Sequence, residues 1–228
     1  MPEKEKIREM FDSIAPEYDA FNHLTSLGID KLWRRKALRW IEGPQVLDVA
    51  CGTGDFAMTI AERRRCGVIG VDISEGMLSE MRRKVLAARL EREVSCEVGD
   101  CAALRFKSGS FDNVTVAFGV RNFEDREACL KEILRVLRPG GKFVMLELGV
   151  PSWRPVRRLY EWYFTHVMPL IGGRMSGNRA AYRYLPASVL NFPGPKEWTA
   201  FMRSCGFTDV RHRALSFGIC RLYIGTKS

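Results

Sequence analysis

The stretch that decides the fold reads VLDVACGTGD at residues 46–55 and is followed by VIGVD at residues 68–72. This pattern predicts a strand, a glycine turn, a helix and a second strand that ends in a carboxylate. Gly52 and Gly54 let the backbone approach a ligand at the carboxyl end of the first strand, and Asp72 lies where a ribose diol needs acceptors. The sequence therefore predicts a nucleotide-cofactor site.

Two carboxylates beside the glycine turn discriminate between cofactors. Taken alone, GTGDFA at residues 52–57 satisfies the Gly-x-Gly-x-x-Gly/Ala pattern of dinucleotide sites. Asp48 in the strand and Asp55 at the start of the helix, however, lie where a dinucleotide would place its pyrophosphate, and these anions would repel. S-adenosylmethionine carries a sulfonium and an ammonium, which carboxylates attract. We therefore predict a methyltransferase in which Asp48 binds the methionine ammonium or orients the loop.

Composition favours one globular domain. The chain has 228 residues, of which 46% are hydrophobic, and no stretch reaches the roughly 18 apolar residues that a membrane span needs. The first residues mix both charge signs, which argues against a secretion or import signal. Seven cysteines form no Cys-x-x-Cys pair and three histidines are scattered, so we expect a reduced cytoplasmic protein without a metal site.

The formal net charge of +9 predicts an anionic partner, which is a nucleic acid, an anionic membrane surface or an acidic substrate. Two of the four arginine clusters, at residues 63–65 and 82–84, lie on predicted helices of the cofactor domain and are typical of solvated faces. Those that flank aromatic segments are better candidates for binding.

Strands and helices alternate through most of the chain, which predicts a parallel sheet covered on both faces. The alternation stops between Val150 and about Asn191 and then resumes with a helix and two tightly joined strands. We expect strands at about 45–50, 67–72, 94–99, 112–118, 142–148, 208–215 and 218–226, with Pro139-Gly140-Gly141 as the turn into the fifth. We expect helices at about 5–15, 30–41, 55–65, 74–89, 125–137 and 195–205.

At this point the chain resembles a known family. Two stretches, YDAFNHLTSLGIDKLW at residues 18–33 and RVLRPGGKFVMLE at residues 135–147, are similar to signatures of the ubiquinone/menaquinone biosynthesis C-methyltransferases. FGVRN at 118–122 and AYRYL at 181–185 are further family-like segments. The first stretch is the discriminating one, because the second occurs in many small-molecule methyltransferases.

The resemblance implies an α/β, Rossmann-like class I methyltransferase. Its seven-stranded sheet is mostly parallel with an antiparallel last strand, carries helices on both faces, and has a helical insertion before the sixth strand. We expect a single domain over residues 1–228, made of an N-terminal helical lid (1–43), a cofactor-binding half (45–149), a substrate-covering insertion (150–191) and a C-terminal helix with a strand hairpin (192–228).

The chain departs from the family at five positions. The family usually has methionine at Phe21, an aliphatic residue at Thr25, histidine at Asp30, and serine at Ala117 and Gly149. We expect these departures to leave cofactor binding unchanged, but they leave open which quinone ring is the substrate.

The resemblance also assigns cofactor contacts. It places Thr53 in the glycine loop at the cofactor, Asp72 on the ribose hydroxyls, and Asp100 with Cys101 beside the adenine, and we add Ala117 to this set. Asp100 follows the third strand, where a carboxylate accepts from an exocyclic amine while the Cys101 N–H donates to a ring nitrogen. The alternatives are a helix cap for Asp72 and an ordinary Gly-Asp turn for Asp100.

Methylation of a quinol carbon needs a phenolate, and a phenol with a pKa near ~10 costs about 4 kcal/mol to ionise at pH 7. Arg121 and Asn122 are the catalytic candidates, because the loop after the fourth strand opens toward the cofactor methyl in this family. Arginine stays protonated and cannot act as the base, so we assign Arg121 to stabilising the phenolate and Asn122 to positioning water. The alternative for Arg121 is a structural pair with Glu124 or Asp125.

Two segments are expected to cover the site. The stretch that contains Tyr18, Asp19 and Asn22 is the candidate lid over both reactants. In the insertion, the segment from Trp153 to Phe164 mixes aromatic residues with arginines, which suits a polyprenyl tail arriving from a membrane surface. Ordinary packing of an extra helix is the alternative.

We therefore expect S-adenosylmethionine-dependent C-methylation of a polyprenyl quinol, most simply demethylmenaquinol to menaquinol, with the methoxy-polyprenyl-benzoquinol step of ubiquinone synthesis also open. We expect a cytoplasmic protein with peripheral contact to the inner face of an anionic membrane and no nucleic-acid partner. The oligomeric state stays open, and a homodimer is one alternative. A nucleic-acid methyltransferase and a non-catalytic cofactor-binding assembly protein are the alternatives.

Overall fold

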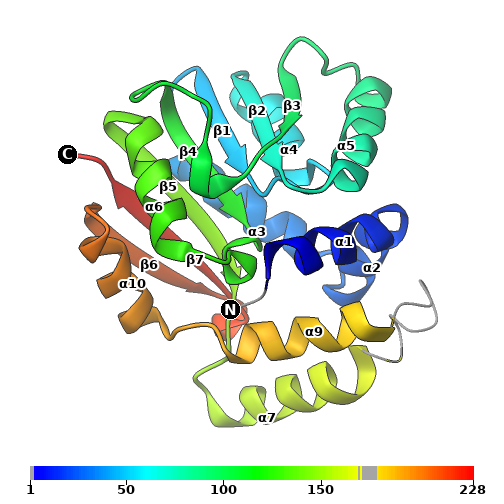
Figure 1. Cartoon of the computed structure of the whole chain (residues 1–228). Coiled ribbons are helices and arrows are strands. Elements are labelled where there is room, and N and C mark those ends of the chain that lie inside the picture. The colour runs from blue at the N-terminus through cyan, green and yellow to red at the C-terminus, as the bar shows by residue number, and fades with distance from the viewer. Residues whose placement is uncertain (1–2, 169, 171–178) are drawn as a thin grey trace.

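A seven-stranded sheet forms the centre of the molecule (Figure 1). The computed structural model describes residues 3–168, 170 and 179–228. The sheet order is β3-β2-β1-β4-β5-β7-β6, where β1 to β5 run parallel and β7 is antiparallel to both of its neighbours. The strands are β1 (Gln45–Val49), β2 (Gly67–Asp72), β3 (Val94–Val98), β4 (Phe111–Ala117), β5 (Leu137–Leu148), β6 (Thr208–Leu215) and β7 (Cys220–Thr226). The predicted topology, including the antiparallel last strand, is confirmed.

Helices cover both faces of this sheet. One face packs against α3 (Ile29–Ala37), α4 (Asp55–Arg64) and α5 (Glu75–Ala88), and the other against α6 (Arg126–Val136) and α10 (Pro195–Ser204). Each face has its own buried apolar cluster, because the central strands present apolar side chains to both sides. Local signals fix where the helices begin: Ser74 accepts a hydrogen bond from the Met77 N–H, and Asp125 accepts one from the Ala128 N–H.

Further helices gather beyond the carboxyl ends of the parallel strands (Figure 1). At the N-terminus these are α1 (Lys4–Ile14), η1 (Ala15–Glu17) and α2 (Tyr18–Thr25), and η2 (Leu38–Trp40) follows α3. From the insertion come α7 (Arg154–Trp162), the π-helical η5 (Tyr163–Val167) and α9 (Arg179–Leu190). Residues 169 and 171–178 of the expected insertion lie outside the described residues. Short turns η3 (Cys101–Ala103), η4 (Val120–Asn122) and η6 (Ser216–Gly218) complete the fold.

Two local expectations differ from the structure. The stretch after Pro16, for which the sequence predicted no helix, forms η1 and α2, because Phe21 is buried there in a cluster with residues of α1 and the insertion. The fifth strand begins at Leu137 rather than Lys142, so Pro139-Gly140-Gly141 lies within β5 instead of forming a turn before it. A register shift against β4 and main-chain hydrogen bonds to Lys227 accommodate this segment.

Among the helices that the structure describes, none is long and apolar enough to cross a membrane.

Candidate active site

The loops after β1 and β4 meet at the carboxyl edge of the sheet. Ala50 and Gly52 have φ of 51° and 55°, and Phe118 has φ of 63°, so both loops turn through the left-handed region immediately after their strands. The loops approach so closely that a Cβ on Gly119 would lie 2.7 Å from the Ala50 Cβ. Two cavities lie on either side of this junction.

The smaller cavity, about 120 Å³, contains the residues expected at a nucleoside. Asp72 ends β2 and lines it, with Oδ2 accepting from the Gly52 N–H at 2.8 Å and Oδ1 from the Ser74 N–H at 2.9 Å. Burial raises the pKa of this carboxyl, although both N–H groups oppose the rise. Asp72 thus caps the loop, and its remaining lone pairs are available to a diol.

The far end of the same cavity holds Asp100 and Cys101. The Asp100 Oδ1 accepts from the Ala102 N–H at 2.9 Å, and its Oδ2 pairs with Lys4 Nζ at 2.8 Å. Burial raises the pKa of Asp100, but Lys4 and the Ala102 N–H outweigh it, so the net pKa is lowered. The buried Cys101 thiol donates to the Cys129 carbonyl and adds apolar surface beside the carboxylate. This end offers an ionised acceptor beside an apolar wall, as an aminated aromatic base requires.

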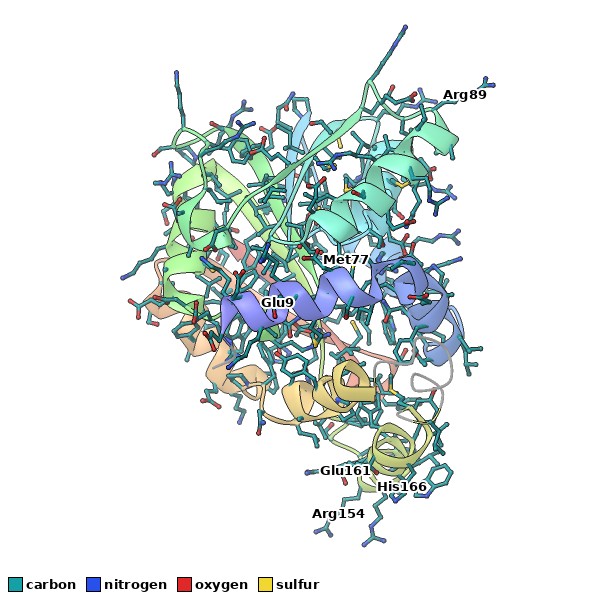
Figure 2. All side chains as sticks on the ribbon, turned by 45° about the vertical axis from the view of Figure 1, so that its right-hand side comes forward. Glu9, Met77, Arg89, Arg154, Glu161 and His166 are labelled. Carbon is teal, nitrogen blue, oxygen red and sulfur yellow. The ribbon has the colours of Figure 1, made fainter. Side chains whose placement is uncertain are left out.

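Helix α1 covers the smaller cavity. Lys4, Ile7 and Phe11 line it, and Asp12 anchors the helix by accepting from Ser74 Oγ at 2.6 Å and the Gly76 N–H at 3.0 Å. Figure 2 shows α1 next to the end of α5 at which Met77 lies. A cofactor in this cavity would therefore be enclosed between the sheet edge and the N-terminal helix.

The larger cavity, about 500 Å³, shares a wall with the smaller one. Five residues line both: Tyr18, Ala50, Gly52, Ala117 and Phe118. The remaining wall of the larger cavity comes from α2, α3, α7 and η5, including the lid candidates Asp19 and Asn22. Two reactants placed in these cavities would meet at the shared wall.

Arg121 lines the larger cavity from η4 and is 6% exposed. Its Nη1 lies 2.6 Å from Glu147 Oε1 and also donates to the Phe118 carbonyl, while its backbone N–H donates to Glu147 Oε2. The alternative pairing with Glu124 or Asp125 is wrong, because the buried carboxylate of Glu147 at the end of β5 is the partner and Asp125 caps α6. Burial opposes the charge, but Glu147 and Tyr18 outweigh it and raise the pKa of Arg121.

Asn122 follows Arg121 but faces the smaller cavity. Its Oδ1 accepts a hydrogen bond from the Tyr184 hydroxyl at 3.0 Å. The two catalytic candidates are therefore adjacent in sequence and line different cavities, on either side of the shared wall.

Asp48 lies deep in β1 and lines the larger cavity. Its Oδ1 accepts from Thr115 Oγ1 at 2.6 Å, whereas its buried Oδ2 has no partner among the described residues. Burial raises the pKa of Asp48 to about 7. A cation at Oδ2 would restore the ionised form, so an ammonium group fits this position.

The other two loop residues expected at the cofactor have structural contacts. Thr53 is buried, lines the larger cavity and donates to Asp19 Oδ1, and Asp19 also pairs with Lys84 at 2.6 Å. Gly54 lines neither cavity, and a Cβ there would lie 2.5 Å from Met81 Cγ. Gly54 thus allows α4 and α5 to approach, and Thr53 connects the loop to α2.

A charged network joins α2, α3 and α4 beside the larger cavity. His23 lies 3.0 Å from Asp30 and 3.4 Å from Asp55, close enough together to be considered as metal ligands. Arg34 pairs with both carboxylates and Lys84 pairs with Asp55 at 2.5 Å. These cations balance the carboxylates, so we interpret the network as a set of structural ion pairs that hold the N-terminal helices against the glycine loop.

The sequence interpretation missed Glu147 and Lys4, and it placed Tyr160 only in the segment expected to receive the tail. A signal existed for Glu147, because it ends the strand next to β4 and neighbouring parallel strands end at one edge. No local pattern marks Lys4, which reaches the site through the packing of a helix that is remote in sequence.

Together, the sheet order with one antiparallel strand, the loop after β1 and the carboxylates ending β2 and following β3 define a class I S-adenosylmethionine-dependent methyltransferase. Asp72 and the unpaired Asp48 oxygen fit the diol and the ammonium of that cofactor, and apolar walls fit its adenine. The chain belongs to the ubiE/COQ5 methyltransferase family, which it matches over residues 1–227.

Relatives and solved structures agree with this assignment. The chain is 48% identical to the ubiquinone/menaquinone biosynthesis C-methyltransferase UbiE of Geobacter sulfurreducens, over 98% of this chain and 89% of that protein. It is 44% identical to the demethylmenaquinone methyltransferase of Bacteroides fragilis, over 98% and 93% respectively. The structure resembles a putative S-adenosylmethionine-dependent methyltransferase of Methanococcus maripaludis, with a TM-score of 0.69, 16% identity and coverage of 96% of this chain and 94% of that one.

Proposed function

We propose that this protein transfers a methyl group from S-adenosylmethionine to a ring carbon of a polyprenyl quinol, with demethylmenaquinol as its substrate. The observation that carries the proposal is the pair of cavities with one shared wall. The smaller offers acceptors for a nucleoside, and the larger has several times its volume. The names of the relatives support a quinone substrate.

In this proposal the chain's own groups bind and orient the reactants. We assign Asp72 to the ribose diol, Asp100 to the adenine amine and Asp48 to the methionine ammonium. The sulfonium supplies an electrophilic methyl group, so that a C–C bond forms as the S–C bond breaks and the ring proton leaves to solvent. The N-terminal helices and the insertion serve as covers that exclude water from the shared wall.

Arg121 supplies the charge that the ring needs. A phenolate in the larger cavity would lie in a site closed by apolar side chains, where a fixed guanidinium lowers the pKa of the bound quinol. Glu147 balances the charge of Arg121, but the buried Arg121 Nε has no partner among the described residues and is left as a donor for the ring oxygen. Asn122, on the other side of the wall, is assigned to orienting water.

A labelling assay tests the proposed function. The purified protein is incubated with methyl-labelled S-adenosylmethionine and with reduced demethylmenaquinone, a demethylated benzoquinol of the same tail length, or transfer RNA. We expect label in the naphthoquinol product. Faster labelling of the benzoquinol would move the substrate to ubiquinone synthesis, and labelling of RNA alone would contradict quinol methylation.

We also propose that the mouth of the larger cavity rests on an anionic membrane. Exposed large apolar residues occur on α2, on α3 and the turn between them, on α7 and its N-cap, and on η6: Leu24, Leu27, Ile29, Leu32, Trp153, Leu159, Trp162 and Phe217. Four of these, Leu27, Ile29, Leu159 and Trp162, also line the cavity. A contiguous apolar rim of this kind is typical of a binding surface.

Contacts hold the three rim segments together. The Tyr163 hydroxyl donates to the Thr25 carbonyl at 3.1 Å, and Trp33 Nε1 donates to Ser216 Oγ at 3.0 Å. Leu27 is 82% exposed with φ of 52°. An exposed leucine side chain gains no burial energy, and a left-handed backbone is unfavourable for a residue with a Cβ. Such a residue is expected where a turn serves binding. The rim is thus one surface that a lipid-soluble substrate would cross.

The basic residues on α7 make the membrane proposal testable. Arg154, Arg157 and Arg158 are exposed, although Arg157 pairs with Glu161 at 2.7 Å. Figure 2 places Arg154 and Glu161 at one end of the molecule and Arg89 at the other. Each basic residue near an anionic surface contributes on the order of 1 kcal/mol, screened by salt, so binding should be peripheral and reversible.

We expect the protein to sediment with phosphatidylserine-containing vesicles at low salt and to be released when Arg154, Arg157 and Arg158 are all changed to Gln. The matched control changes Arg63, Arg89 and Arg92 to Gln, which removes the same charge from exposed positions elsewhere. If the α7 variant sediments to the same extent as the control, the arginines of α7 do not bind the membrane and the segment serves only as packing.

A further inference from the structure

Several residues around the larger cavity carry a buried polar atom without a partner. Among the described residues, seven buried side-chain nitrogen or oxygen atoms have no hydrogen-bond partner, and four of them belong to residues lining this cavity: Arg34, Asp48, Arg121 and Tyr160. A buried polar group without a partner destabilises a fold, so native proteins rarely keep several around one space. Their concentration indicates that a polar ligand completes these bonds.

Tyr160 is the residue of this set that the assignments above leave unexplained. It lies on α7, is 6% exposed, and its ring packs against Phe164 with centroids 4.2 Å apart. The surrounding cluster is apolar, with Ile14, Phe21 and Met77 among its members. Its hydroxyl is buried and has no acceptor among the described residues, and the residue lines the same cavity as Arg121.

Arg121 has a free donor in the same cavity. Its Nη1 is used by Glu147 and the Phe118 carbonyl, and its buried Nε has no partner among the residues that the structure describes. Burial raises the pKa of the Tyr160 hydroxyl and the charge of Arg121 opposes this rise, so the two groups act on each other electrostatically. Both are donors at pH 7, and together they suit one oxygen that carries negative charge.

We propose that the Tyr160 hydroxyl is a second donor to the ionised ring oxygen of the substrate, acting with Arg121. This inference rests on the proposed function, since it names the group that holds the quinol oxygen in that same site. Two donors from different elements, η4 and α7, would fix the ring plane as well as its charge. The insertion would then be part of the catalytic site and not only a cover.

Tyr160→Phe tests this role, because it removes one oxygen and keeps the ring that packs on Phe164. We expect kcat/KM for demethylmenaquinol to fall about tenfold, with the affinity for S-adenosylmethionine unchanged. The acid limb of the pH–rate profile should move up by about one pH unit, because the bound quinol loses a donor to its anion. Tyr223→Phe is the control, since Tyr223 is buried on β7 and lines neither cavity.

A binding measurement separates this inference from the proposed function. The probe is 1-naphthol, whose ionised and neutral forms differ in absorbance, titrated with pH in the presence of each protein. We expect the parent and the Tyr223→Phe variant to lower the pKa of the bound naphthol more than Tyr160→Phe does. Equal naphthol pKa values in all three proteins, or a loss of activity in Tyr160→Phe without a shifted pH profile, would overturn the role of Tyr160. Absence of methylation by the parent itself would instead overturn the proposed function.

Discussion

Arg121→Ala should lower the turnover number by about 10²- to 10³-fold while leaving the affinity for S-adenosylmethionine unchanged, because we assign the residue to the quinol oxygen and to no group of the cofactor. The remaining activity should depend on pH in a defined direction. Without the guanidinium, the bound quinol regains a pKa close to that of a free phenol, so its ionised fraction keeps increasing with pH beyond the point where the parent saturates. The ratio of variant to parent turnover should therefore rise with pH.

The buried partner of Arg121 requires a second variant. Removing the arginine leaves Glu147 charged, 0% exposed and unpaired, which typically costs about 3–5 kcal/mol of stability. Arg121→Lys keeps a cation for Glu147, but one ammonium cannot also replace the free Nε donor. We expect Arg121→Lys to unfold close to the parent temperature and still to turn over at least tenfold more slowly. A ratio to the parent that is flat with pH in both variants would contradict phenolate stabilisation.

The sheet was predictable because its signals are local. Strands β1 and β2 are short apolar runs ended by glycine or aspartate, and a buried parallel strand needs nothing more. The last two strands are joined by only four residues, which include η6, and so short a connection makes them antiparallel neighbours. The start of β5 was missed for the opposite reason, because Pro139-Gly140-Gly141 is locally a turn and becomes part of the strand only through bonds to Lys227.

The site was predictable where it lies at strand ends. Asp72 and Asp100 follow β2 and β3, so the rule that ligands bind at the carboxyl edge of such sheets places them together, and both line the smaller cavity. The covers of the site follow no such rule. Lys4 and Tyr160 reach it from α1 and α7, whose docking depends on contacts such as Asp12 with Ser74, 62 residues apart. Periodicity predicts that such a helix exists, but not what it packs against.

Asp72 holds the glycine loop through hydrogen bonds, and we also assign it to the cofactor. Its replacement should therefore affect both the loop and the ligand contact. Its carboxylate holds the Gly52 N–H at 2.8 Å and the Ser74 N–H at 2.9 Å, so it shapes the loop that separates the two cavities. It also keeps unused lone pairs toward the smaller cavity, where we assign the ribose diol. Asp72→Asn retains one acceptor oxygen and the size of the side chain, whereas Asp72→Ala removes both tasks.

We expect calorimetry to show cofactor affinity lower by roughly tenfold for Asp72→Asn and by a hundredfold or more for Asp72→Ala, since each hydrogen bond to a charged group contributes about 1.5–3 kcal/mol. Asp112→Ala is the matched control. Asp112 also accepts from a backbone N–H, that of Gln45 at 2.9 Å, and pairs with Arg138, but it lies at the start of β4 and lines neither cavity. The control should bind the cofactor like the parent. Equal affinity in the parent and both Asp72 variants would refute the ribose assignment, and tight binding of NADH by the parent would show that the carboxylates beside the glycine turn do not select a cationic cofactor.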